Sequence, residues 1–218
     1  MKEIEIIYED RSLVVVNKPS GLAVHNGPTN LINILVSEFG ERLKPVHRLD
    51  QETSGIILLA RGAKGAARLQ QALVSSESSK EYFALVRGKP PQQVGDWTAQ
   101  ISPKAEGRKN PAGASKDRVQ AHTHFEVIAQ TPWLSMLKCQ LLTGRQHQIR
   151  KHAALAGCYI VGDRRYGDPK HVRMISHRFK FNGLALHASQ LTITHHDRQH
   201  TFTAPPPTEW EVFGFESL

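Results

Sequence analysis

With 218 residues, of which 39% are hydrophobic and 22% are charged, the chain can bury a core of its own and is expected to be globular. No run approaches the roughly 20 consecutive apolar residues that a transmembrane helix needs, which excludes a membrane-spanning helix. The 28 basic residues outnumber the 20 acidic ones, which gives a net charge of +8. This charge favours binding to a polyanion, nucleic acid first, over the alternative that it serves only solubility.

The spacing of apolar residues predicts strands interrupted by a few helices. Alternation and short continuous apolar runs indicate strands, and apolar residues three or four positions apart indicate helices. In chain order we expect strands at 4–8 and 13–16, a helix at 30–40, a strand at 56–60, a helix at 63–73, strands at 80–88, 119–128 and 133–142, a helix at 146–157, strands at 184–195 and 200–205, and a stiff proline-rich tail at 205–210. Asn30 and Gly40 supply the cap and the stop of the first helix. This mixture favours an α+β fold with a largely antiparallel sheet, in a single domain over residues 1–218.

Residues 88–118 show little core signal and are interpreted as an exposed, mobile loop. They contain two adjacent prolines, several glycines and a basic cluster. The cluster consists of Lys104, Arg108, Lys109, Lys116 and Arg118, set against Glu106 and Asp117. Because the loop is long and positive, contact with phosphates is favoured over a merely solvated surface.

The segment HRLDQETSG, residues 47–55, places an acid on the way into the core. Asp50 stands between Arg48 and the apolar run Ile56 to Ala60. Burying an unpaired carboxylate costs several kcal/mol, so Asp50 is either a cap or paired residue or a residue that does chemistry. An isolated aspartate is more often the former.

Two further segments could carry chemistry. The segment KEY, residues 80–82, opens a predicted strand. Residues 141–167 place Gly144 and Arg145 where a strand leads into a helix. Backbone amides and a helix start at that point would attract an anion, either a phosphate or a carboxylate.

Together these segments resemble the RluA family of RNA pseudouridine synthases. HRLDQETSG is similar to the family's catalytic-aspartate signature, and TGRQHQIRKH followed by GDRRYG is similar to its C-terminal signature. VNKPSGL and LHASQLTITH are similar to further family segments in the expected order, so the resemblance covers nearly the whole chain. It implies that uridines in a structured RNA, a tRNA or an rRNA hairpin, are isomerised to pseudouridine by base flipping, cleavage of the N1–C1′ bond and rejoining through C5. It also implies a mixed, mainly antiparallel sheet with flanking helices and a central RNA-binding cleft, without a metal, nucleotide or redox cofactor.

The resemblance also implies roles for single residues. Asp50 matches the catalytic aspartate, Tyr82 the tyrosine that sits against the target base, and Arg145 the arginine that pairs with the aspartate. Residue chemistry agrees, because a carboxylate attacks only when ionised and a nearby guanidinium lowers the pKa that burial would raise. The residues expected to bind RNA or substrate are Arg48, which would enter the space left by the flipped base, with His47, Lys80, His147, Arg150 and Leu186.

Each of these assignments has a structural alternative. Tyr82 could be a core tyrosine, Arg145 could bridge to another acid at a helix start, and Leu186 could be plain core. For the whole chain, the alternatives are an RNA-binding or chaperone module without catalysis, and a small-molecule hydrolase that uses Asp50. The joint presence of Asp50, Tyr82 and Arg145 favours the synthase.

The 12 histidines do not predict a metal site. His147 and His152 are five positions apart and do not share one helical face, whereas His195, His196 and His200 lie in or near a predicted hairpin. No cysteine or acidic residue stands at ligand spacing from them along the chain, so no metal is expected.

The start of the chain and its cysteines predict the compartment. The first residues alternate and carry acids, unlike a signal peptide, and Cys139 and Cys158 show no CxxC spacing, so a reducing cytoplasm is expected. The catalytic pattern begins within the first 20 residues. We therefore expect a stand-alone domain without the S4-type RNA-binding domain of many relatives, acting as a monomer. Specificity is expected in residues 88–118, where relatives carry variable substrate-contacting loops.

Overall fold

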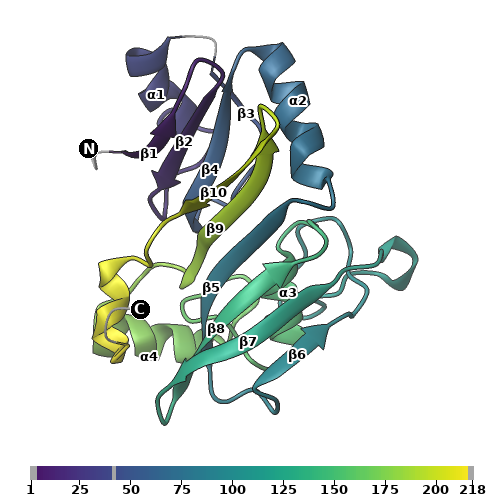
Figure 1. Cartoon of the computed structure of the whole chain (residues 1–218). Coiled ribbons are helices and arrows are strands. Elements are labelled where there is room, and N and C mark those ends of the chain that lie inside the picture. The colour runs from purple at the N-terminus through teal and green to yellow at the C-terminus, as the bar shows by residue number, and fades with distance from the viewer. Residues whose placement is uncertain (1–3, 41–42, 216–218) are drawn as a thin grey trace. The chain divides into compact units, whose positions relative to one another are not determined.

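The computed structural model describes residues 4–40 and 43–215, and the chain divides into two compact units. The first unit comprises the residues up to Lys80 together with His187–Pro206, and the second comprises Glu81–Leu186 together with the residues from Pro207 onward. Figure 1 follows the chain through both units and labels their elements. The two ends of the single domain predicted over 1–218 lie outside the described residues, and that domain assignment stays a prediction.

The first unit is built on a mixed sheet. Its strands are β1 (Glu5–Glu9), β2 (Leu13–Lys18), β3 (Leu43–Pro45), β4 (Ser54–Arg61), β9 (Leu186–His195, of which Leu186 belongs to the second unit) and β10 (Arg198–Thr203). Antiparallel pairing joins β1 to β2, β2 and β3 to β4, and β10 to β9. β4 and β9 run parallel, with Ser54 opposite His187 and Gly55 opposite Ala188.

The core of the first unit lies around β2 and β4. Leu13–Val16 and Ile56–Ala60 are buried without exception, so both faces of these strands are covered, which explains their continuous apolar sequence. The helix α2 (Ala63–Val74) adds Ala66, Leu69 and Leu73, spaced three and four apart, to the same core cluster.

The first helix begins and ends where the sequence predicts. In α1 (Leu31–Phe39), the Asn30 side chain accepts a hydrogen bond from Asn33 N at 2.9 Å, and Gly40 follows the last turn with a φ of 81°. Its buried residues are Leu31 and Leu35.

The second unit contains an antiparallel sheet in the order β5-β8-β7-β6. These strands are β5 (Ser79–Arg87, of which Ser79 and Lys80 belong to the first unit), β6 (Val94–Trp97), β7 (Thr123–Gln130) and β8 (Leu134–Leu141). Its helices are α3 (Gln148–Leu155) and α4 (Pro169–Phe179), with short 3-10 helices at Ser115–Asp117 and Thr208–Phe213. One core cluster draws on β5, β8, α3 and α4. The α+β fold with a mixed, mainly antiparallel sheet is thus confirmed.

Two short strands and one α-helix were not predicted from the pattern. β3 and β6 are short, and α4 begins at Pro169 behind the cap Asp168, whose side chain accepts from Lys170 N at 2.9 Å. The predicted stiff tail instead contains a 3-10 helix that buries Trp210 and Phe213. Among the described residues, no helix is long and apolar enough to cross a membrane.

The prediction of an exposed loop over residues 88–118 is wrong in part. The segment contains β6, and Ile101, which pairs with Val119, is buried together with Ser102. A single apolar residue between polar neighbours carries no periodic signal, so only its tertiary contacts reveal that it is core. The basic side chains of the cluster are nevertheless exposed.

Candidate active site

The loop that carries Asp50 is fastened by a buried ammonium group of the first unit. Lys18, at the end of β2, is fully buried, and its Nζ donates to the carbonyls of Pro19 at 3.0 Å, Leu22 at 2.8 Å and Gln51 at 3.1 Å. Burial lowers the pKa of Lys18 to about 8. The negative charge of Asp50 acts in the opposite direction and raises this pKa. The ammonium therefore remains charged at neutral pH and holds the peptide group next to Asp50.

Backbone hydrogen bonds close the same loop. Gly21 N donates to Gln51 O at 2.9 Å, and Gln51 Nε2 donates back to Gly21 O at 3.0 Å. Thr53 N donates to Asp50 O at 3.1 Å, which makes a turn of the residues that follow Asp50. Asp50 is half-buried and is the first residue of this turn. The hydrogen bonds of Gln51 and Thr53 hold the backbone around it in place.

The backbone at the start of β4 is tightly packed against β9. Thr53 and Ser54 are buried, and Ser54 Oγ hydrogen-bonds His187 Nδ1 at 2.9 Å. Gly55 has a φ of 107°, and a Cβ at this position would lie 2.6 Å from Ala188 N. Only glycine allows β4 and β9 to approach this closely just beyond Asp50.

His47 and Arg48, both expected to bind RNA, have different environments. The Arg48 side chain is exposed next to Leu49 and Asp50. His47 Nε2 accepts a hydrogen bond from Leu58 N at 3.1 Å, which ties the ring to β4. Burial, and then the charge of a nearby lysine, lowers the pKa of His47 to about 4, so the ring is neutral at physiological pH.

Lys80 lies at the carboxyl end of α2. Its Nζ donates to Leu73 O at 3.2 Å, in the last turn of that helix, and burial lowers its pKa. A cation at this position stabilises the helix end. The contact gives Lys80 a structural role in addition to the RNA contact expected for it.

Tyr82 and Leu186 both pack in the second unit. Tyr82 stands opposite Cys139 in the pairing of β5 with β8, and it is partly buried against the core cluster of this unit. Leu186 is buried in the same cluster. Both positions agree with the alternative that these are core residues. Their roles toward a target base stay predictions.

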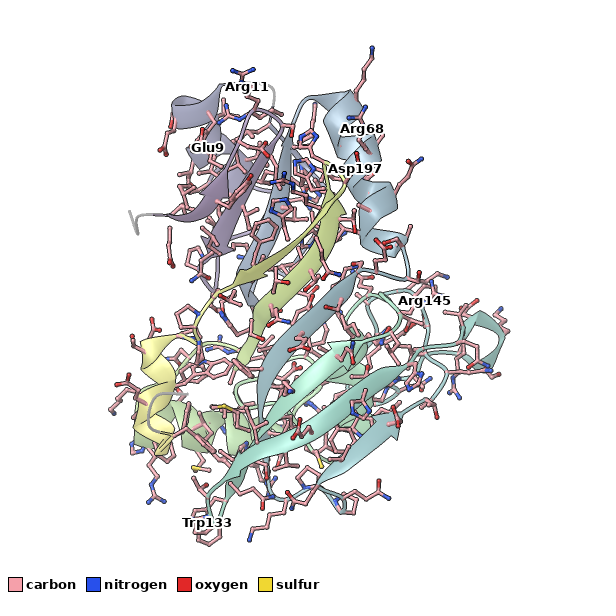
Figure 2. All side chains as sticks on the ribbon, viewed as in Figure 1. Glu9, Arg11, Arg68, Trp133, Arg145 and Asp197 are labelled. Atoms are coloured by element: carbon pink, nitrogen blue, oxygen red, sulfur yellow. The ribbon has the colours of Figure 1, made fainter. Side chains whose placement is uncertain are left out.

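Arg145 lies in the connection between β8 and α3, as expected, and Figure 2 labels it. Its Nε donates to Gln120 O at 3.2 Å, and its backbone N donates to Gln148 Oε1 at 3.0 Å. Gln148 is buried and also donates from Nε2 to His122 O at 2.9 Å. Gln148 thus positions Arg145, a role that the sequence reasoning missed although TGRQHQIRKH contains both residues. The attraction of an anion by Gly144 and Arg145 stays a prediction.

Arg150 lies inside the second unit rather than on its surface. Its Nε is 2.9 Å from Asp163 Oδ2 and its Nη2 is 2.9 Å from Asp163 Oδ1, and both side chains are buried. Asp163 Oδ1 also accepts from the backbone N of Arg165 and of Tyr166. The bidentate pair holds the GDRRYG segment against α3, so the geometry supports a positioning role for Arg150.

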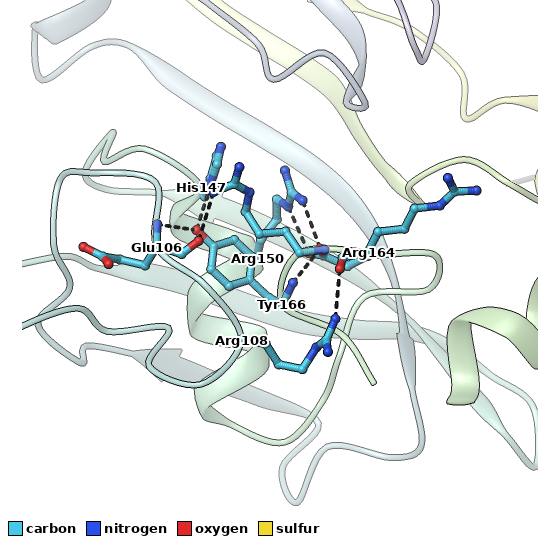
Figure 3. A network of polar contacts seen from close by, with 8 residues as sticks. Glu106, Arg108, His147, Arg150, Arg164 and Tyr166 are labelled. Carbon is cyan, nitrogen blue, oxygen red and sulfur yellow. Dashed lines mark hydrogen bonds and ion pairs between the residues drawn. The ribbon is translucent and has the colours of Figure 1, made fainter. Parts of the chain in front are cut away.

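Tyr166 connects this segment to the start of α3 (Figure 3). Its hydroxyl lies 2.8 Å from His147 Nδ1 and accepts from Glu106 N at 3.2 Å. Burial raises the pKa of Tyr166 to about 12, so it remains a phenol. His147 is therefore held by Tyr166, to which the sequence assigned no role although Tyr166 lies in the GDRRYG segment.

The same segment fixes the basic region 104–109, also shown in Figure 3. Arg165 Nη1 donates to Glu106 O at 3.0 Å, and Arg108 Nη2 donates to Arg164 O at 3.1 Å. The buried Lys151 adds hydrogen bonds from Nζ at 2.6 Å to the carbonyl of Lys104 and to that of Ser102, just before this region. The side chains of Lys104, Arg108, Lys109, Arg164 and Arg165 remain exposed and form what we call the basic surface of the second unit.

The first unit holds Asp50 on a hydrogen-bonded loop, and the second unit carries an exposed basic surface, which suits contact with a polyanion. Comparison with known proteins identifies the family. Residues 12–155 match the family model described as RNA pseudouridylate synthase. The chain belongs to this family, as the resemblance to the RluA family predicts.

Curated relatives agree with this assignment. The chain is 34% identical over 205 residues to "Uncharacterized RNA pseudouridine synthase YlyB" of Bacillus subtilis, covering 88% of this chain and 65% of that protein. It is 35% identical over 199 residues to "Ribosomal large subunit pseudouridine synthase C" of Escherichia coli K12, covering 87% and 62%. It is 34% identical over 212 residues to "tRNA pseudouridine synthase C" of Pectobacterium carotovorum, covering 88% and 56%. The chain thus spans less than two thirds of the length of these relatives.

Solved structures show the same fold. "Human RNA Pseudouridylate Synthase Domain Containing 4" superposes with a TM-score of 0.81 at 25% identity, covering 97% of this chain and 94% of that one. "Human RNA Pseudouridylate Synthase Domain Containing 1" superposes with a TM-score of 0.80 at 22% identity, covering 97% and 86%. The second likeness shows the fold alone.

Proposed function

We propose that the chain is an RNA pseudouridine synthase, an isomerase that converts specific uridines of a structured RNA to pseudouridine. The observation that carries the proposal is the Asp50 loop, held by Lys18 in a chain that belongs to the RNA pseudouridylate synthase family. The names of two relatives refer to tRNA and to the large ribosomal subunit. The substrate that we propose is accordingly a stem-loop of tRNA or rRNA.

In this proposal, Asp50 is the catalytic carboxylate, Tyr82 lies against the target base and Arg145 supports the ionised aspartate. Asp50 belongs to the first unit, and Tyr82 and Arg145 belong to the second. A guanidinium favours the charged form of a carboxylate, and an aromatic ring offers a stacking face worth about 1–3 kcal/mol per base. No cofactor is needed, because the reaction is redox-neutral and the substrate supplies every heavy atom of the product: the proton lost from C5 goes to water, and N1 takes up a proton in its place.

RNA recognition is assigned to exposed cations and to their neighbours. Arg48 is exposed beside Asp50 and suits both stacking and phosphate contact. The basic surface of the second unit supplies further charge on a backbone that hydrogen bonds hold in place, which reduces the ordering cost of binding. The remaining substrate-binding residues in this proposal are His47, Lys80, His147 and Leu186. Arg150 acts by positioning.

The proposal is tested with RNA labelled with tritium at uridine C5. Forming the new bond at C5 releases that tritium to water, so release reports the isomerisation itself. Transcripts of tRNA and rRNA are offered separately to the wild-type chain and to Asp50→Asn. We expect release by the wild type from one class of RNA, and none by the variant.

RNA affinity measured in parallel separates catalysis from binding. Asp50→Asn removes one charge without changing the size of the side chain, so we expect its RNA affinity to stay close to that of the wild type. Turnover by the variant would end the catalytic assignment of Asp50. Tight binding without release by the wild type, from any RNA, would favour the RNA-binding module instead.

The compartment and the oligomeric state complete the proposal. We place the reaction in the cytoplasm, the compartment of tRNA and ribosomes in the bacteria from which these curated relatives come, and we expect a monomer. Gel filtration tests the monomer: a mass near 24.4 kDa is expected. A mass near twice that value would contradict it.

A further inference from the structure

Metal-binding atoms gather at one end of the first unit, where the turn between β1 and β2 meets the tip of the β9–β10 hairpin. Asp10, His195 and His196 each offer one such atom, and these atoms all lie within 4.8 Å of one another. Asp10 Oδ2 is 3.0 Å from His195 Nε2. Ser12 Oγ lies 3.2 Å from His195 Nε2 and 3.3 Å from His196 Nε2. Figure 2 labels Asp197, the neighbour of His196 at this tip.

The donor set has the chemistry of a transition-metal site. Two imidazole nitrogens and a carboxylate oxygen are common ligands of Zn²⁺, and imidazole also suits Co²⁺, Ni²⁺ and Cu²⁺. In a tetrahedral site with bonds of about 2.0–2.1 Å, neighbouring ligand atoms lie roughly 3.3 Å apart. The Asp10–His195 separation of 3.0 Å is close to that value. Because the whole set lies within 4.8 Å, turning the exposed His196 side chain toward this pair would bring the three atoms around an ion.

The backbone of the hairpin tip directs the two histidines. His196 and Asp197 have φ values of 50° and 59° and form the two-residue turn between β9 and β10. The His195 side chain is 5% exposed and that of Asp10 is 23% exposed, whereas His196 is exposed. An ion can therefore enter from the side of His196 and reach ligands that are already shielded from water.

We propose that Asp10, His195 and His196 form a binding site for a divalent transition metal ion, with Zn²⁺ as the ion of choice and Ser12 Oγ or water as the fourth ligand. The bound ion replaces the Asp10–His195 hydrogen bond by two coordinate bonds, which requires Nε2 of both rings to be free of hydrogen. It links the β1–β2 turn to the β9–β10 hairpin. The site involves neither Asp50 nor the basic surface, so its test does not depend on the proposed function.

The test is calorimetric titration of the full chain, stripped with a chelator, with ZnCl₂. The variant His196→Asn removes the exposed imidazole and keeps a residue that tolerates a left-handed backbone, so the hairpin should still fold. His25→Asn removes an exposed histidine outside the cluster and is the matched control. Circular dichroism checks the fold of each variant, and Co²⁺ in place of Zn²⁺ gives an absorption band that reports coordination.

We expect one Zn²⁺ per chain for the wild type and for His25→Asn. His196→Asn should bind at least about tenfold more weakly and lose the Co²⁺ band, since even residues behind the ligands contribute about 10–100-fold to affinity. Two results would overturn the proposal. One is a wild type that takes up no stoichiometric Zn²⁺, and the other is a folded His196→Asn that binds as tightly as the wild type.

Discussion

At the scale of the residue, a buried ammonium group must find acceptors, and at Lys18 three backbone carbonyls provide them. Two of these acceptors belong to the loop after β2, and the third is the carbonyl of Gln51, directly after Asp50. One side chain therefore sets the distance between two loops that have no regular secondary structure. The position of a catalytic group depends on such contacts as much as on the group itself.

Lys18→Met is expected to damage both stability and turnover. Methionine fills a similar volume but leaves the carbonyls without their donor, at a cost of at least about 2 kcal/mol in the free energy of unfolding. Displacement of the Asp50 loop should lower kcat about a hundredfold. Urea denaturation and the tritium-release rate measure the two effects. Lys44→Met, at an exposed lysine of β3, is the control and should match the wild type in both. A Lys18→Met variant with the stability and kcat of the wild type would refute this account of the loop.

At the scale of the element, the parallel contact between β4 and β9 is short and depends on one glycine. Gly55 has a φ of 107°, and a Cβ there would meet the backbone of Ala188, at 2.8 Å from its carbonyl carbon and closer still to its oxygen. Backbone atoms within a sheet cannot move aside as a flexible side chain can. The two strands can approach in this way because Gly55 has no side chain.

Gly55→Ala is therefore expected to lower the free energy of unfolding by about 3 kcal/mol or more, from backbone strain and overpacking together. Gly107→Ala is the matched control, because a Cβ at Gly107 meets no atom within 4 Å. That control should change stability by less than about 0.5 kcal/mol. Thermal and urea unfolding of both variants provide the measurement. Equal stability of the two variants would contradict the close approach of β4 and β9.

At the scale of the whole molecule, the net charge of +8 acts on any polyanion, and the basic surface of the second unit concentrates part of it. Binding of RNA should therefore weaken steeply as salt rises, with a log–log slope of about −0.7 to −0.9 for each phosphate contact. Lys109→Ser, within the basic surface, should make the slope less negative by about one such contact. Fluorescence anisotropy at several salt concentrations measures the slope.

Lys64→Ser, at an exposed position of α2, tests whether the effect belongs to the basic surface or to net charge alone. Both variants lose one positive charge. If their slopes change equally, the basic surface has no special part in binding. A slope near zero for the wild type would instead favour the small-molecule hydrolase, which needs no polyanion.

The sequence alone predicts most of the helices and strands, the fold class, the family and the place of Asp50 just before a buried strand. Each of these depends on neighbours along the chain: the continuous run Ile56–Ala60 indicates a buried strand, and Asn30 with Gly40 delimits a helix. α4 was not predicted, although it begins with an aspartate cap and a proline and carries Val172, Ile175 and Phe179 three and four positions apart, so its start and its apolar face both had a local signal.

Only the tertiary structure decided which side chains act on one another. Arg150, expected to touch RNA, is buried against Asp163, and the Arg145 side chain donates to the carbonyl of Gln120, 25 positions away. Asp10 meets His195, although 185 positions separate them and no ligand spacing along the chain relates them. The physical reason is that pairing and burial depend on contacts between distant residues, which the folded chain alone creates, whereas propensity, caps and periodicity depend on the sequence within a few residues.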